Sequence, residues 1–156
     1  MGLKLAQRSL NFLKTDVARA MPDYELRNPQ LDMMEACSKA IEEGGTLMAE
    51  AGTGTGKTFA YLIPIILSGK KTIVSTGTIN LQGQLASKDL SFLSELVPFS
   101  YTIAKGRGNY LCLRRLNAFR ADNDKEADEY TDLVNWAAKT ETGDAEDYHL
   151  KKPLIW

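Results

Sequence analysis

The sequence contains few of the residues on which disulfide-rich, metal-binding and DNA-coating proteins depend. Its 156 residues include 2 cysteines and 1 histidine, which excludes a disulfide framework and a zinc site with several Cys and His ligands. Positive charge is not in excess either: 19 Lys and Arg face 20 Asp and Glu, for a net charge of -1. This balance excludes a wholly basic nucleic-acid binder, although it allows a local basic patch.

Long apolar runs are also missing. The longest, residues 61–67, is far shorter than the roughly 20 residues of a membrane-spanning helix. The N-terminus lacks the apolar core of a signal peptide, so we expect a cytoplasmic protein with no membrane partner. With 44% hydrophobic and 25% charged residues, the chain has an ordinary globular composition and about the length of one domain.

Apolar residues at three- and four-residue steps predict helices. One helix is expected over residues 3–20 and another from Asn28, which is expected to cap it with Pro29 at the first helical position. The Gly44-Gly45 pair is expected to end this second helix. Further helices are expected from Lys57 and from Thr78.

Short apolar or β-branched segments between these helices predict strands. They are residues 46–50, 72–76 and 100–104. Strands separated by helices require crossover connections, so we expect an α/β fold: a parallel sheet with flanking helices. After residue 104 a basic stretch (105–120) and then an acidic, helical one (122–147) replace this pattern. The sequence therefore predicts a first domain over residues 1–104 and a mainly helical insertion over 105–156.

The strongest motif lies between a predicted strand and a predicted helix, as a Walker A phosphate loop must. Its glycines let backbone N–H groups surround phosphate oxygens, Lys57 supplies a charge for the β- and γ-phosphates, and Thr58 offers a hydroxyl ligand to Mg²⁺. The bland alternative is a glycine-rich turn with a surface lysine. The predicted site for ATP comprises Ala51, Gly52, Thr53, Gly54, Thr55, Gly56, Lys57 and Thr58.

Four elements in order resemble the DinG/XPD-type branch of superfamily 2 DNA helicases. They are residues 27–30, the phosphate loop with its flanks at 50–64, the segment 75–85, and residues 105–112 with 142–146. The resemblance implies a RecA-like domain and ATP-dependent, 5′-to-3′ unwinding of single-stranded or forked DNA, with a role in DNA repair. It also implies that Gln30 reads the adenine edge beside Arg27.

The same resemblance implies a path for DNA over the segment that follows the second predicted strand. Cationic side chains with an interleaved aromatic residue also suit single strands, although a solvated helix face is the plain alternative. The predicted nucleic-acid contacts are Thr76, Thr78, Gln82, Lys105, Arg107 and Tyr110.

Cys112 resembles the first iron–sulfur ligand of this family, and the resemblance implies that it is such a ligand in the parent protein. A [4Fe–4S] cluster takes four thiolates, and Cys37 is expected to be a buried structural thiol, so no cluster is expected in this chain alone. The acidic pair that would hold Mg²⁺ is missing as well: Asp128-Glu129 lies in a predicted helix and does not qualify. His149 is expected on the surface.

We therefore expect the ATP-binding portion of an ATP-dependent DNA helicase, cut before its hydrolytic acids and second lobe. Lys57 and Thr58 are the catalytic candidates, with ATP and Mg²⁺ as ligands. Alone, the chain is expected to bind nucleotide without unwinding. A small nucleoside or nucleotide kinase, using Arg114, Arg115 or Arg120, is one alternative, and a non-catalytic nucleotide- or DNA-binding module is the other. The oligomeric state is left open.

Overall fold

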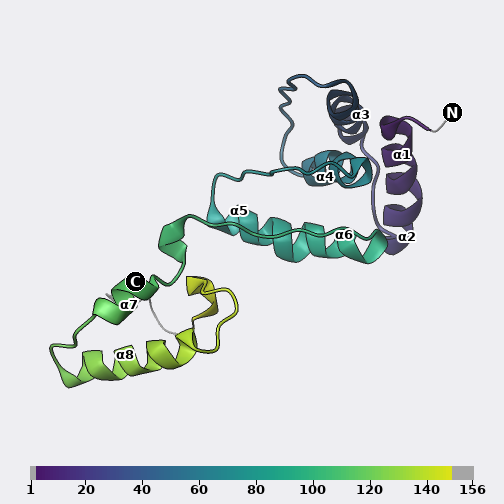
Figure 1. The fold of residues 1–156 in the computed structure, drawn as a ribbon. Coiled ribbons are helices and arrows are strands. Elements are labelled where there is room, and N and C mark those ends of the chain that lie inside the picture. Colours follow the sequence, from purple (N-terminus) through teal and green to yellow (C-terminus); the bar gives the residue numbers. More distant parts are fainter. Residues whose placement is uncertain (1–2, 149–156) are drawn as a thin grey trace. The chain divides into compact units, whose positions relative to one another are not determined.

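The computed structural model describes residues 3–148, and the chain divides into two compact units, residues 1–102 and 103–156 (Figure 1). The first unit contains α1 (Leu5–Phe12), η1 (Leu13–Val17), α2 (Ala18–Ala20), α3 (Asn28–Glu43), α4 (Lys57–Ser68), α5 (Ile79–Gln84), η2 (Leu85–Leu90) and α6 (Ser91–Leu96). The second contains η3 (Arg107–Asn109), α7 (Leu113–Ala118), α8 (Asp124–Ala137) and η4 (Ala145–Asp147). The turns η1 and η2 are π-helical, and η3 and η4 are 3₁₀ turns.

The first unit is built around α3 and α4, which pack against each other and against α1. The predicted N-terminal helix is confirmed, since α1, η1 and α2 follow one another without a break from Leu5 to Ala20. Its apolar face and those of α3, α4, η2 and α6 meet in one core, made by Leu13, Val17, Met34, Ala60, Leu62, Ile63, Leu85 and Leu93. Among residues 3–148 no helix has both the length and the apolar character needed to cross a membrane.

Glycines end both helices of this pair. Gly44 (φ 79°) follows α3 and Gly69 (φ 66°) follows α4, and this left-handed backbone region favours a residue without Cβ. The start of α3 differs from the expectation, because Asn28 lies inside the helix and Arg27 occupies the cap position. The Arg27 carbonyl accepts the N–H groups of Gln30 and Leu31, so the hydrogen-bonded helix begins one residue earlier than predicted.

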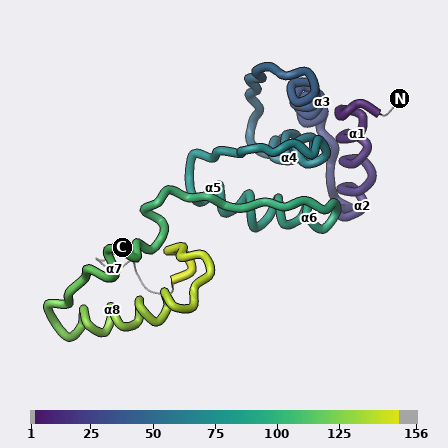
Figure 2. The backbone as a smooth tube through the Cα atoms, viewed as in Figure 1, coloured from purple at the N-terminus to yellow at the C-terminus, as the bar shows by residue number. Residues whose placement is uncertain are grey.

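The three predicted strands are not formed. Over residues 3–148 the only β-type pairing is a single antiparallel bridge between Tyr110 and Asp144. Segments 46–50 and 72–76 instead run as irregular chain, with Met48 and Ile73 each 93% exposed (Figure 2). A parallel strand exists only against neighbouring strands that supply its hydrogen bonds, and β-branched composition cannot replace them. The parallel sheet is thus absent from the described residues.

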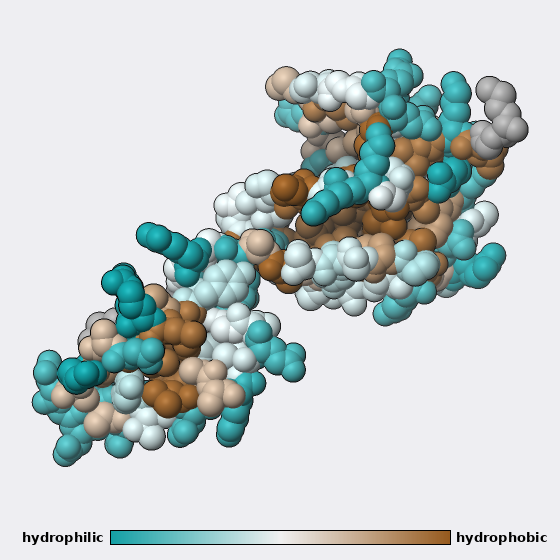
Figure 3. All heavy atoms as spheres, in the orientation of Figure 1, coloured by the Kyte–Doolittle hydropathy of each residue, from teal (hydrophilic) through white to brown (hydrophobic). Residues whose placement is uncertain are grey.

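The second unit is a small helical body with a core of its own, formed by Leu116, Leu133 and Tyr148. The rings of Trp136 and Tyr148 contact each other at a tilt of 57°, with centroids 5.1 Å apart. Helix α8 begins at a reciprocal cap, since the Asn123 side chain accepts the N–H of Glu126 at 3.0 Å. In each unit, hydrophobic atoms gather centrally with hydrophilic atoms around them (Figure 3).

Candidate nucleotide site

The predicted phosphate loop leads directly into α4, the longest apolar helix of the first unit. Gly54 (φ 76°) and Gly56 (φ 77°) take the left-handed conformation that turns the chain back, and Gly56 is the N-cap of α4. The first backbone N–H groups of a helix have no partner inside it, so they can be offered to an anion at this end. The loop therefore ends at the N-terminus of a helix, and its binding of phosphate stays a prediction.

The Lys57 ammonium lies within the loop. Its Nζ donates hydrogen bonds to the carbonyl oxygens of Ala51 at 2.5 Å and Gly52 at 2.7 Å. Thr55 Oγ1 also donates to the Gly52 carbonyl, at 2.9 Å. The loop is thus folded around a positive charge whose partners are backbone oxygens, and phosphate oxygens of greater charge can take their place.

Thr58 follows on the first turn of α4, where its hydroxyl interacts with the side chain of Tyr61 one turn later. Burial raises the pKa of Tyr61, the Thr58 hydrogen bond lowers it, and the carboxylate of Asp89 raises it further. Burial also raises the pKa of Asp89 itself. The Thr58 hydroxyl therefore lies next to the half-buried Tyr61 side chain.

Arg27 and Gln30, the two residues predicted to lie at the nucleotide base, both contact the phosphate loop. The Arg27 guanidinium donates to the carbonyl of Gly54, and its other nitrogen lies 3.5 Å from the Glu25 carboxylate. Gln30 Nε2 donates to the carbonyl of Gly56 at 2.9 Å. A Cβ on Gly56 would lie 2.2 Å from that Nε2 atom, so only glycine allows this approach.

A pocket of about 380 Å³ opens beside these contacts. It is lined by residues 21–25, Arg27, Gln30 and the loop residues 54–56. This volume falls in the range of roughly 300–1,000 Å³ that is usual for small-molecule sites. One wall includes Tyr24, whose hydroxyl donates to Gln30 Oε1 at 2.7 Å. The sequence did not predict Tyr24 as a site residue, and its only indication there is an aromatic residue six positions before Gln30.

Three of the predicted DNA contacts, Thr76, Thr78 and Gln82, lie in the first unit around the start of α5. Thr78 is the N-cap of this helix, and its Oγ1 accepts the N–H of Leu81 at 3.2 Å. Thr76 Oγ1 donates to the Thr78 carbonyl at 3.1 Å. Both hydroxyls therefore contribute to the local turn, and their role toward DNA stays a prediction.

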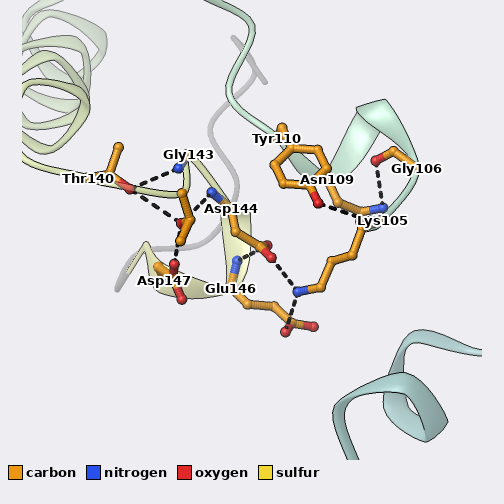
Figure 4. Close-up of polar contacts among 10 residues, drawn as sticks. Lys105, Gly106, Asn109, Tyr110, Thr140, Gly143, Asp144, Glu146 and Asp147 are labelled. Carbon is orange, nitrogen blue, oxygen red and sulfur yellow. Dashed lines mark hydrogen bonds and ion pairs between the residues drawn. The ribbon is translucent and has the colours of Figure 1, made fainter. Parts of the chain in front are cut away.

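The other three, Lys105, Arg107 and Tyr110, lie in the second unit and differ in accessibility. Arg107 is exposed. The Lys105 side chain is only 8% exposed, and its Nζ lies 2.5 Å from Asp144 and 2.7 Å from Glu146 (Figure 4). Burial lowers the pKa of Lys105, but the hydrogen bonds and charges of the two carboxylates outweigh it and raise the pKa overall.

Tyr110 completes this arrangement, because its hydroxyl accepts the backbone N–H of Lys105 at 2.9 Å. The Leu111 N–H donates to the Gly143 carbonyl at 2.8 Å, beside the Tyr110–Asp144 bridge. These contacts tie the beginning of the second unit to residues 143–146. The sequence separates the basic and acidic stretches clearly, yet their pairing at Lys105 was not anticipated.

The two cysteines lie in different units. Cys37 is buried on α3, where burial raises the pKa of its thiol. Cys112 is half-buried at the N-cap of α7, and the backbone N–H of Arg115 is the main cause that lowers its pKa. Within residues 3–148, no three Cys, His, Asp or Glu side chains come together as a metal site.

The remaining candidates lie away from the phosphate loop in the sequence. Asp128 and Glu129 lie inside α8 of the second unit, in agreement with the helix for which they were excluded as the acidic pair that holds Mg²⁺. Arg114 and Arg115 are exposed on α7, and Arg120 donates to the carbonyl of Phe119 at 2.7 Å. His149 lies outside the described residues.

Comparison with known proteins identifies the family to which the chain belongs. The family model for DEAD/DEAH box helicases matches residues 31–116, more than half of the chain, and the chain belongs to that family. The resemblance to DinG-type helicases is confirmed by the relatives below.

Three of them illustrate the similarity. The chain is 44% identical over 138 residues to the "ATP-dependent DNA helicase YoaA" of Haemophilus influenzae, an alignment that covers 85% of this chain and 22% of the relative. It is 41% identical over 115 residues to the "ATP-dependent DNA helicase DinG" of Escherichia coli (69% and 16%). It is 35% identical over 151 residues to the "3'-5' exonuclease DinG" of Bacillus subtilis (90% and 16%). The chain thus spans about a fifth or less of each relative's length. No solved structure matches it significantly.

Proposed function

We propose that this chain is the ATP-binding part of a DinG-like, ATP-dependent DNA helicase of the cytoplasm. The observation that carries the proposal is the contact between Gln30 and Gly56, which joins the residue expected to read adenine to the loop expected to hold the phosphates. The helicase names of the relatives support the same reaction class.

The donor set of the loop fits MgATP. The backbone N–H groups at the start of α4 and the Lys57 ammonium would hold the β- and γ-phosphates, with Lys57 exchanging its bonds to Ala51 and Gly52 for bonds to phosphate. The Thr58 hydroxyl is the oxygen donor for Mg²⁺, which supplies neutralising charge to the phosphates when bound. Gln30 would contact the base in the adjoining pocket.

A RecA-like sheet and a DNA path are further parts of the proposal. Segments 46–50, 72–76 and 100–104 would become its strands when paired with strands from the rest of a longer protein, which the relatives' greater length supports. Thr76, Thr78 and Gln82 would face single-stranded DNA, and Arg107 and Tyr110 would add contacts. Lys105 would have to leave its two carboxylates to join them.

An iron–sulfur cluster does not fit this chain's own residues. The chain has 2 cysteines, and Cys37 and Cys112 belong to different units. A four-thiolate cluster therefore needs ligands from elsewhere. We propose that Cys112 serves as one ligand in the whole helicase.

Isothermal titration of the 156-residue chain with ATP and Mg²⁺ tests the proposal. We expect binding that Lys57→Ala weakens at least tenfold, since a charged hydrogen bond contributes roughly 1.5–3 kcal/mol. Lys71→Ala, an exposed lysine outside the loop, should leave binding unchanged. Absent binding, or equal binding by both variants, would contradict the proposal.

A second measurement separates the rival functions. We expect ATP hydrolysis near background with or without single-stranded DNA, because no acidic pair follows a strand in the described residues. Hydrolysis that DNA stimulates and Lys57→Ala abolishes would show that the chain is catalytically sufficient. Phosphate transfer to a nucleoside would instead support the kinase alternative.

A further inference from the structure

The amide of Gln30 is held at both ends by the protein. The residue is only 2% exposed, its Oε1 accepts the Tyr24 hydroxyl at 2.7 Å, and its Nε2 donates to the Gly56 carbonyl at 2.9 Å. A glutamine amide has almost the same shape after a half-turn, so only its partners decide which atom points where. Here a backbone carbonyl can only accept, and it therefore faces the NH₂ group.

Tyr24 fixes the other end of the amide as an acceptor. Burial raises the pKa of Tyr24, while its Gln30 hydrogen bond and Arg27 lower it, and the net rise keeps the hydroxyl protonated at neutral pH. The protonated hydroxyl donates to Oε1. These two bonds use one lone pair of Oε1 and one N–H of Nε2, so each end of the amide keeps one further hydrogen-bonding group, and Gln30 lines the pocket next to the phosphate loop.

This pair of groups distinguishes the two purines. Adenine presents N7 as an acceptor and its 6-amino group as a donor, and a glutamine amide bonds both at once. Guanine presents N7 and O6, which are two acceptors, so its O6 would face the Oε1 lone pair. We propose that Tyr24 is a specificity-determining positioning residue, whose hydroxyl holds the Gln30 amide in the orientation that accepts adenine and rejects guanine.

The inference rests on the proposed nucleotide binding and extends it to a residue outside the phosphate loop. The ring of Tyr24 has a separate packing role, since its centroid lies 6.1 Å from that of Phe59. Tyr24→Phe keeps this ring contact and removes only the hydroxyl. Tyr101→Phe is the matched control, because the Tyr101 hydroxyl also donates to the protein, to the Ala86 carbonyl at 3.3 Å, and lies outside the pocket.

The experiment measures dissociation constants of ATP and GTP, with Mg²⁺, for the 156-residue chain and both variants. We expect the wild-type chain to prefer ATP, and Tyr24→Phe to weaken ATP binding roughly 3- to 10-fold with GTP binding unchanged, as for one hydrogen bond. Tyr101→Phe should keep the wild-type ratio. An unchanged ATP-to-GTP ratio in Tyr24→Phe, or the same fall in Tyr101→Phe, would overturn the inference.

A series of ligands adds an affinity comparison that a change in packing alone would not affect. Purine riboside triphosphate lacks the 6-amino group, so the wild-type chain should lose affinity for it, and Tyr24→Phe should lose less. Equal wild-type affinity for ATP and this analogue would overturn the inference without any variant. If ATP and GTP bind equally but both need Lys57, phosphate binding stands and adenine reading fails. If neither binds, both proposals fail.

Discussion

A methyl group on Gly56 should damage the site and the first unit together. Its Cβ would lie 2.2 Å from Gln30 Nε2 and 2.7 Å from Cδ, so the buried amide must move away. Moving it breaks the bonds to the Gly56 carbonyl and the Tyr24 hydroxyl, at about 1 kcal/mol each. The left-handed backbone of Gly56 (φ 77°) adds about 1 kcal/mol of strain for alanine. Gly56→Ala should thus lower the free energy of unfolding by about 3 kcal/mol.

Gly69→Ala provides the matched comparison. Gly69 has a similar φ of 66° at the end of α4, but nothing lies within 4 Å of its Cβ position, so only the strain of about 1 kcal/mol applies. Hydrogen exchange of the α3 and α4 amides measures the stability of the first unit in both variants. Gly56→Ala should lower the free energy of unfolding by about 2 kcal/mol more than Gly69→Ala does, and it should also weaken ATP binding. Equal protection in the two variants would refute the reasoning.

Three further predictions concern the second unit and the thiols. The pKa of Tyr148 is raised to about 12 by burial and by nearby acidic side chains, so the unit should lose stability as pH rises from 10 to 12. Trp136 fluorescence measures this loss of stability, and Tyr148→Phe should remove most of its dependence on pH. Lys105→Met removes the buried ammonium that pairs with Asp144 and Glu146 and should destabilise the unit by about 2 kcal/mol in urea; an unchanged midpoint would contradict it. Iodoacetamide at pH 7.5 should label Cys112 before Cys37, as mass spectrometry of peptides would show, because their pKa values shift in opposite directions.

Local chemistry explains what could be predicted from the sequence. Glycine directly after an apolar helical pattern favours a helix end, so the end of α3 at Gly44 could be predicted from the sequence. The phosphate loop was predicted on the same local basis, because its spacing encodes a backbone shape rather than a long-range contact, and its binding of ATP stays a prediction. Family membership followed from the order of such local motifs, and the helicase match confirms it.

Long-range partners explain what could not. The β-branched segment 72–76 has the composition of a strand, but hydrogen-bonding neighbours decide whether a strand forms, and none pairs with it within residues 3–148. The Tyr24–Gln30 bond depends on a loop conformation that no propensity describes. Lys105 was predicted to contact nucleic acid because its stretch is basic, whereas in the structure its ammonium pairs with Glu146, 41 positions later in the chain.

Lys105 lies near the start of the second unit, and Asp144 lies near the end of its described part. Lys105, Tyr110 and Asp144 bring both ends of a long stretch of chain to one place, so the intervening residues form a closed loop with a narrow base. The entropy of closing a loop grows only with the logarithm of its length, so a loop fastened at its base can lengthen or shorten at little cost in stability. Residues inserted between α7 (Leu113–Ala118) and α8 (Asp124–Ala137) would therefore lengthen the loop at little cost and leave its base unchanged.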